Sequence, residues 1–468
     1  MMTRSRIRAC YSLSMLVAMA LAGCAVGPAY ERPAIETPQA FKEGQGEWVR
    51  AVPADLLERG PWWALFNDPV LADLAGRVEV SNQNVAAAVA AYSQARALVA
   101  QQRASLFPLV TLDASANRSG GGGNVPTRSS YQVDIGASWE PDVWGRLRRG
   151  VEAARAGEQA SLADLQAARL SSQGELAANY FNLRQFDAAQ VLLAQTIEGY
   201  VRALNIAQNR YDAGIVARTD VLQAQTQLSN AQADLLGLER QRATLEHAIA
   251  VLVGQAPANF TLPASADWKG VIPPIPFNVP STLLQRRPDI AAAERRAAQA
   301  NEQIGIAQSA LFPSLSLSGS AGFGAARIGD LFNASAFAWS VGASLAQVIF
   351  DAGANRARVE GARGQFEQAA AQYRQTVLGA FAQVEDQLVA SRILQQQLVL
   401  RQQAEEAAIL VEQQLLNRYQ AGQVSYTDVV TAQVTALNAR RAVVQAQADR
   451  QVAAVALIQA LGGGWRGL

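Results

Sequence analysis

Two hydrophobic patterns alternate along this chain, and each occurs twice. Over most of its length, apolar residues recur at helical spacing, mainly Ala with Val and Leu, set among Gln, Arg and Glu. Two shorter stretches, 109–139 and 314–346, change to an alternation of apolar and polar residues. The first pattern predicts amphipathic helices, and the second predicts β-hairpins with one apolar and one polar face. The chain is therefore expected to be mainly α, with two β-hairpins between long helices.

The predicted hairpins have the length of membrane strands. Each strand has about 10 residues, and Trp139 and Trp339 suit an interfacial position. A soluble sheet with one wetted face fits the same alternation. Four strands also leave two unpaired edges, which lipid does not tolerate, so several copies must close one barrel. A dimer gives about 8 strands and a filled interior, whereas a trimer gives about 12 and room for a lumen, which favours the trimer.

Proline positions separate the segments in which long helices can form. Prolines cluster from Pro28 to Pro69 and from Pro257 to Pro288, and none occurs in 143–256 or after Pro313. The expected divisions are a signal peptide (1–23), a lipid-anchored extended arm (24–67), a first repeat (68–256), a Pro-rich equatorial linker (257–280) and a second repeat (281–468).

Both repeats have the same expected order of helix, hairpin, long helix, tip and returning helix. The first repeat is expected to open with one continuous helix from Asp68-Pro69 to Ser105, and the second with a helix over 281–310. The two long helices, 147–211 and 354–419, each measure roughly 100 Å at 1.5 Å per residue. The returning helices are expected over 218–253 and from the second tip to Leu461.

The strongest evidence for duplication is a repeated tip sequence. Residues 209–225 return 208 positions later as 417–433, with 11 of 17 positions identical. Each copy ends a helix at Tyr-x-Ala-Gly and begins the next near Thr-Asp, which predicts a tight reversal at 209–217 and at 417–425.

The first 24 residues have the features of an export signal that ends in a lipid attachment site. Arg4, Arg6 and Arg8 precede a short apolar run, and Leu-Ala-Gly-Cys follows. This ending resembles a bacterial lipobox, which implies cleavage before Cys24, its acylation and, with Ala25 next, an outer-membrane destination. The alternative is a free cysteine behind an ordinary signal.

Composition gives little support to an enzyme. The chain has 40 basic and 39 acidic residues, one His and two Cys, with Cys10 inside the signal. We expect no metal, cofactor or nucleic acid, because the sequence has no ligand cluster, phosphate-binding Gly loop or basic patch. His247 is interpreted as an ordinary helix residue.

Motifs distributed over nearly all of the mature chain resemble those of the TolC/OprM family of outer-membrane efflux channels, in particular its lipoprotein, NodT-like branch. Besides both tips and both Phe-Pro breaks, these motifs are Cys24-Ala25-Val26-Gly27-Pro28, Tyr30, Arg32-Pro33, Trp62-Trp63, Phe66, Asp68-Pro69, Arg287-Pro288-Asp289-Ile290 and Glu294. The resemblance implies a homotrimer with a 12-stranded β-barrel continuous with a periplasmic α-helical barrel. It also implies a periplasmic adaptor and an inner-membrane pump, of RND type, as partners.

The resemblance assigns two roles to the tips. Contact with the adaptor is implied for Arg210, Gly214, Val221 and Leu222 in the first tip and for Arg418, Gly422, Val429 and Val430 in the second. A periplasmic gate is implied at Asp220 and Asp428, with Tyr419 reaching Asp220 and with Thr219 beside it. The second acid of the family pattern is absent, since Gln223 and Thr431 take its place. The simpler alternative is that Thr219-Asp220 and Thr427-Asp428 cap the returning helices.

The function expected from these features is that of an outer-membrane channel conducting small molecules out of the cell. The alternative is a periplasmic coiled-coil adaptor or scaffold lipoprotein without a pore. An adaptor has one coiled-coil hairpin, whereas this sequence predicts two helical hairpins and two membrane-like strand pairs.

Overall fold

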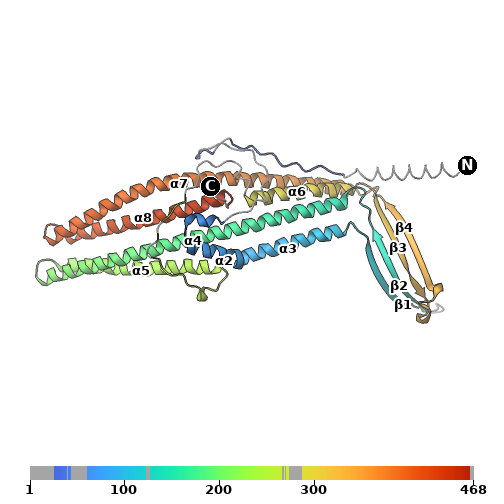
Figure 1. Ribbon diagram of the computed structural model, residues 1–468, viewed down its shortest axis with the longest axis horizontal. Coiled ribbons are helices and arrows are strands. Elements are labelled where there is room, and N and C mark those ends of the chain that lie inside the picture. The colour runs from blue at the N-terminus through green and yellow to red at the C-terminus, as the bar shows by residue number, and fades with distance from the viewer. Residues whose placement is uncertain are drawn as a thin grey trace. The chain divides into compact units, whose positions relative to one another are not determined.

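The computed structural model describes residues 26–38, 41–43, 61–122, 127–265, 268, 270–273 and 287–463. These residues form long helices and a four-stranded sheet, as the sequence patterns predict (Figure 1). The chain divides into two compact units. The first consists of Met1–Ile35, Ala91–Leu162 and Ala292–Gln375, and the second of Glu36–Ala90, Ala163–Ala291 and Thr376–Leu468.

Helix lengths match between the two repeats. The α-helices are α2 (Pro69–Ser81), α3 (Gln83–Ala104), α4 (Arg146–Asp212), α5 (Arg218–Leu252), α6 (Pro288–Ser309), α7 (Ala354–Gln420) and α8 (Tyr426–Ala460). Both α4 and α7 have 67 residues, and both α5 and α8 have 35. Among the described residues, none of the helices has the length and apolar character needed to span a membrane.

The prediction of one continuous helix from 69 to 105 is wrong, because Asn82 ends α2 and starts α3. Asn82 adopts an extended backbone, and its side-chain Oδ1 accepts hydrogen bonds from the N–H groups of Asn84 and Val85 at 2.9 and 3.1 Å. Its Nδ2 donates to the carbonyl of Leu252 in α5 at 2.7 Å. An Asn side chain that satisfies free N–H groups is a strong helix start, so the break is built into the packing of α2 on α5.

The sheet in the first unit is a four-stranded antiparallel meander. Its strands are β1 (Leu109–Ser119), β2 (Arg128–Trp139), β3 (Ser314–Ala325) and β4 (Phe337–Ala346), in the order β1-β2-β3-β4. Ser316 lies opposite Ser344, and Ser320 opposite Ser340, with hydroxyl oxygens 2.6 and 2.9 Å apart. The two predicted hairpins therefore join through β2 and β3, and β1 and β4 form the edges of this sheet.

The edge strands expose apolar side chains. Both β1 and β4 are exposed along their whole length, whereas β2 and β3 alternate between exposed and half-buried positions. Leu112, Trp339 and Val341 are 72, 71 and 81 % exposed. Apolar patches of this kind mark a surface that contacts lipid or another protein.

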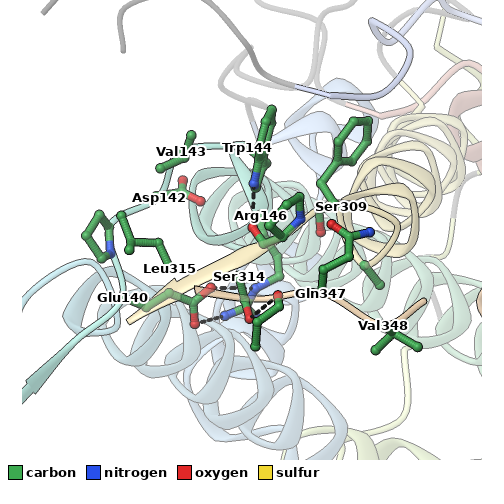
Figure 2. Close-up of a pocket in the computed structure, with 15 residues that line it drawn as sticks. Glu140, Asp142, Val143, Trp144, Arg146, Ser309, Ser314, Leu315, Gln347 and Val348 are labelled. Carbon is green, nitrogen blue, oxygen red and sulfur yellow. Dashed lines mark hydrogen bonds and ion pairs between the residues drawn. The ribbon is translucent and has the colours of Figure 1, made fainter. Parts of the chain in front are cut away.

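The side chains of Trp144 and Arg146 hold the junctions between strands and helices in the first unit. Trp144 stacks on Phe312 with ring centroids 4.8 Å apart and donates its indole N–H to the carbonyl of Pro313 at 2.7 Å. Arg146 forms two hydrogen bonds with the carboxylate of Glu140 (Figure 2). The Trp144 contacts thus hold the start of α4 against the second Phe-Pro break, between α6 and β3, and the Arg146 contacts hold the turn between β2 and α4.

The described part of the N-terminal arm is held within each unit by side-chain contacts. In the first unit, the Tyr30 hydroxyl donates to Glu294 at 2.7 Å, and Arg32 donates to the Tyr373 hydroxyl at 2.8 Å. In the second, the backbone N–H groups of Lys42 and Glu43 donate to the carboxylate of Glu385. Cys24 and the signal peptide lie outside the described residues.

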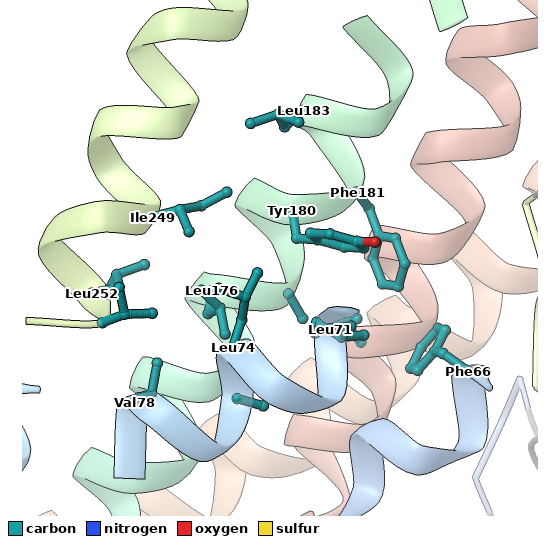
Figure 3. Packing of buried hydrophobic residues seen from close by; sticks show 14 of the residues in the cluster. Phe66, Leu71, Leu74, Val78, Leu176, Tyr180, Phe181, Leu183, Ile249 and Leu252 are labelled. Atoms are coloured by element: carbon teal, nitrogen blue, oxygen red, sulfur yellow. The ribbon is translucent and has the colours of Figure 1, made fainter. Parts of the chain in front are cut away.

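A core cluster of the second unit joins α2 to α4, α5 and α8. Leu71, Leu74 and Val78 of α2 pack there against Leu176 of α4 and Ile249 of α5 (Figure 3). Beside this cluster, Asp187 is buried between Arg184 and Arg242, with ion-pair distances of 2.8 and 2.6 Å. The two Arg also donate to the carbonyls of residues 262 and 263, which fixes the start of the Pro-rich linker.

Candidate functional site: the two helical tips

The two tips, tip 1 between α4 and α5 and tip 2 between α7 and α8, have almost identical backbones. Gly214 and Gly422 have positive φ values of 74° and 73°. The N–H of each glycine donates to the carbonyl of Tyr211 or Tyr419, at 2.8 and 2.9 Å. The next residue donates to the carbonyl of Arg210 or Arg418, at 2.8 and 2.9 Å. This is the helix ending that requires glycine in a left-handed conformation, as the repeated Tyr-x-Ala-Gly predicts.

A hydrophobic cluster, here called the tip core, joins the two tips within the chain. Small residues of tip 1 form one side of it and larger residues of tip 2 the other; its fully buried members are Ala203, Ala207, Ala224, Tyr419, Tyr426 and Val429. The Tyr419 and Tyr426 rings lie 5.1 Å apart. The alanines of tip 1 therefore leave space that the tyrosines of tip 2 fill.

Arg210 connects tip 1 to the end of α7. Its guanidinium donates to the carbonyls of Tyr419 and Gln420 at 2.6 and 3.0 Å and lies 4.8 Å from the centre of the Tyr419 ring. The carbonyls at a helix C-terminus and the face of an aromatic ring both attract a cation. The resemblance implies an adaptor contact for Arg210, whereas in this structure its guanidinium contacts residues of the same chain.

The two predicted gate acids have different partners. Asp220 accepts a hydrogen bond from the Tyr419 hydroxyl at 3.3 Å. Asp428 accepts from the N–H and the hydroxyl of Ser425, at 3.1 and 2.7 Å, and so caps the start of α8. At the same position before α5 stands Ala217, which has no side-chain cap. The capping alternative therefore describes Asp428 and not Asp220.

Burial raises the pKa of both tip-core tyrosines above the ordinary value of 10.0. It raises the pKa of Tyr419, with the negative charge of Asp220 as the next cause. It also raises the pKa of Tyr426 to about 12, and the charges of Tyr419, Tyr200 and Asp220 add to that effect. In the hydrogen bond between the tips, the Tyr419 hydroxyl is the donor and a carboxylate oxygen of Asp220 is the acceptor.

The residues predicted to contact an adaptor differ in exposure. Gly214, Leu222, Arg418 and Gly422 are exposed, and Arg210, Val221 and Val430 are half-buried. Val429 is fully buried in the tip core, so in this structure it has no surface to offer a partner. Thr219, predicted beside the gate, is exposed.

Two residues that organise the site, Ser425 and Tyr426, were not predicted from the sequence. The Ser-x-x-Asp spacing of Ser425 and Asp428 was a readable signal for a capped helix start. Tyr426 carried no such signal, because position 218 of the other repeat is Arg. The part of the chain that the structure describes contains no group of three or more His, Cys, Asp or Glu side chains that could bind a metal ion.

A family model described as "Outer membrane efflux protein" matches residues 74–255 and 279–463. Both repeats are thus matched almost completely, with a gap at the Pro-rich linker.

Individual relatives match over nearly their whole length. The cation efflux system protein CusC of Escherichia coli O6:H1 is 29% identical over 98% of this chain and 99% of its own. The toluene efflux pump outer membrane protein TtgI of Pseudomonas putida is 30% identical over 97% of this chain and 98% of its own. Among solved structures, the outer-membrane channel OprN has a TM-score of 0.86 and 32% identity, over 94% of this chain and 100% of its own.

Proposed function

Because the chain belongs to the outer membrane efflux protein family, we propose that it is the outer-membrane channel of a tripartite efflux system. It passively conducts drugs or other small molecules that an inner-membrane pump, of RND type, and a periplasmic adaptor deliver. The observation that carries this proposal is the four-stranded sheet, whose edge strands β1 and β4 expose apolar side chains. Such transport makes and breaks no bond, so no residue is assigned a catalytic role.

The exposed edges of the sheet support assembly as a homotrimer. In lipid every backbone N–H and C=O needs a partner, so an open sheet must join other sheets. Three copies give a closed barrel of about 12 strands, which is wide enough for a lumen. Acylation of Cys24 then adds a second attachment to the outer membrane.

We place the periplasmic gate at the tips. The Tyr419 hydroxyl donates to Asp220 and ties the two tips of one copy together. Thr219 and Asp428 lie close in sequence to the two residues of this hydrogen bond, and both are exposed. Rings of Asp220 and Asp428 in a trimer would favour cations over anions at the closed mouth.

The exposed part of the tips is the proposed surface for the adaptor. Leu222 is 53% exposed and provides an apolar contact, while Gly214 and Gly422 let a partner approach the backbone closely. The half-buried Arg210, Val221 and Val430 support this surface from below, as does the buried Val429.

The test combines assembly with conductance. The purified chain is run on denaturing gels without heating, to detect a resistant trimer, and is then added to planar lipid bilayers. We expect a trimer and stepwise ion conductance. A monomer that produces no conductance steps would contradict the proposal and favour a scaffold role.

A further inference from the structure

We propose that Arg418 of one copy docks on the end of α4 in the next copy, against Tyr211 and Asp212, and so repeats between copies the contact that Arg210 makes within one. This inference rests on the proposed trimer and names a contact at its seam. The partner is a second copy of this chain.

The first observation is that the chain contains one half of a symmetric arrangement. Arg210 of tip 1 crosses to tip 2, where it binds the Tyr419 and Gln420 carbonyls and covers the Tyr419 ring. The duplicated sequence also places an Arg at 418 in tip 2 and a Tyr at 211 in tip 1. A second Arg donor and a second receptor, meaning a helix end with its Tyr ring, are thus present, but here the donor is in tip 2 and the receptor is in tip 1.

The second observation is that this second pair faces solvent. Arg418 is exposed, and Tyr211 is 40% exposed, whereas Tyr419 is 2% exposed. Neighbouring residues on a helix point about 100° apart. Since Arg210 and Tyr419 face each other across the contact between the two tips, Arg418 and Tyr211 are turned about a right angle from that contact, and both are exposed.

The third observation is that the receptor is already formed. Tip 1 and tip 2 share the same glycine conformation and the same turn hydrogen bonds, so the carbonyls of 211 and 212 end α4 as those of 419 and 420 end α7. A guanidinium placed there meets the same carbonyls and the same ring face.

Charge favours the contact between copies in a way that has no equivalent within a copy. Tip 1 has Asp212 where tip 2 has Gln420. The exposed Asp212 carboxylate, which accepts from Gln208 at 2.8 Å, adds a negative charge beside the receptor. Arg418 therefore gains an ion pair that Arg210 lacks.

Such a contact runs from head to tail and closes a ring. Within each copy, repeat 1 supplies the Arg and repeat 2 the receptor. Between copies, repeat 2 supplies the Arg and repeat 1 the receptor. A heterologous interface of this kind forms a closed ring when the rotation per copy divides a full turn.

The test is crosslinking through surface cysteines with a short bis-maleimide. Arg418→Cys with Asp212→Cys reports the proposed seam, and Arg210→Cys with Gln420→Cys is the matched control inside the chain. We expect covalent dimers and trimers from the first pair, and a crosslinked monomer from the control. If the first pair gives crosslinked monomers or no product while the control reacts, the inference is wrong.

The native mass of the same samples separates this inference from the proposed function. A native trimer without crosslinks between copies overturns only the Arg418 contact. A native monomer overturns both the contact and the trimeric channel.

A charge exchange tests the ion pair without cysteines. Arg418→Glu should speed hydrogen exchange at the tips on the order of fivefold, because like charges then meet across the seam. Adding Asp212→Arg should restore slow exchange. Equal exchange in the single and double variants would contradict the proposal.

Discussion

The two tips are similar in sequence and backbone, yet equivalent side chains differ in burial and in hydrogen-bond partners. Tyr211 and Tyr419 occupy equivalent positions, but the first is exposed and the second lies in the tip core. Asp220 accepts from Tyr419, while Asp428 caps its own helix. The duplicated segment thus forms the same turn in both repeats. The role of each side chain depends instead on whether the other tip of the chain covers it.

The largest expected difference between the tips is at position 426 and its equivalent, 218. Tyr426→Ala should lower the stability of the tip region by about 3–5 kcal/mol, because it leaves a cavity beside Tyr419. The protection of residues 203–224 and 416–433 against hydrogen exchange is the measurement.

The matched control for that variant is Arg218→Ala, since Arg218 is exposed. Its effect should stay within about 0.5 kcal/mol. Equal loss of protection in the two variants would show that the tip core is not asymmetric.

The glycines are the place where the tips should behave alike. Gly214→Ala and Gly422→Ala each force a side chain into a left-handed conformation, which costs about 1–2 kcal/mol. An added Cβ meets nothing within 4 Å at Gly214 and only an Arg210 nitrogen, at 3.7 Å, at Gly422. Both variants should therefore lower the midpoint temperature of thermal unfolding by a similar amount. A large difference between them would mean that one tip is held by contacts beyond its turn.

The helix caps should distinguish the tips by a smaller amount. Ser425→Ala removes the hydroxyl part of the capping box of α8, while the backbone N–H of residue 425 still donates to Asp428, and should cost about 1 kcal/mol. Ala217→Ser, at the equivalent position of tip 1, introduces a cap for α5 and should not destabilise it. Hydrogen exchange over the first turns of α5 and α8 measures both, and a loss of protection in Ala217→Ser would contradict the comparison.

High pH should weaken the tip core through Tyr426. Its pKa is about 12 in the folded chain against an ordinary value of 10.0, so folding favours its protonated form. The resulting stabilisation is complete below pH 10 and is lost as pH rises through 12. Tyr426→Phe cannot titrate, so its tip protection should fall less steeply over this range; an unchanged slope would assign the loss to other groups.

The backbone was predictable because local signals determine it. Alternation of apolar and polar residues over 131–139 predicts β2, and Tyr-x-Ala-Gly predicts both turns. The break at Asn82 has a local part, the cap of Asn84 and Val85 by its side chain, and a distant part, the hydrogen bond from Asn82 to the Leu252 carbonyl 170 residues away. No local pattern reports such a contact.

The roles of the tip residues were only partly predictable, for a related reason. The pairing of Tyr419 with Asp220 is implied by the family resemblance, and the structure has that hydrogen bond. The contact of Arg210 with Tyr419 and the burial of Val429 were not predictable from the sequence. Because the two tips carry the same motif, the sequence does not indicate which side chains of each tip the other tip covers. The gate and the adaptor surface remain predictions.

Single-channel recording in planar bilayers tests the asymmetry of the tips most directly. Tyr419→Phe removes only the hydroxyl that Asp220 accepts, and Tyr211→Phe makes the same change at the equivalent, exposed position. We predict a higher resting conductance for Tyr419→Phe and an unchanged conductance for Tyr211→Phe. Equal conductance in the two variants would contradict the assignment of tip 2 and its bond to Asp220 as the closing contact of the channel.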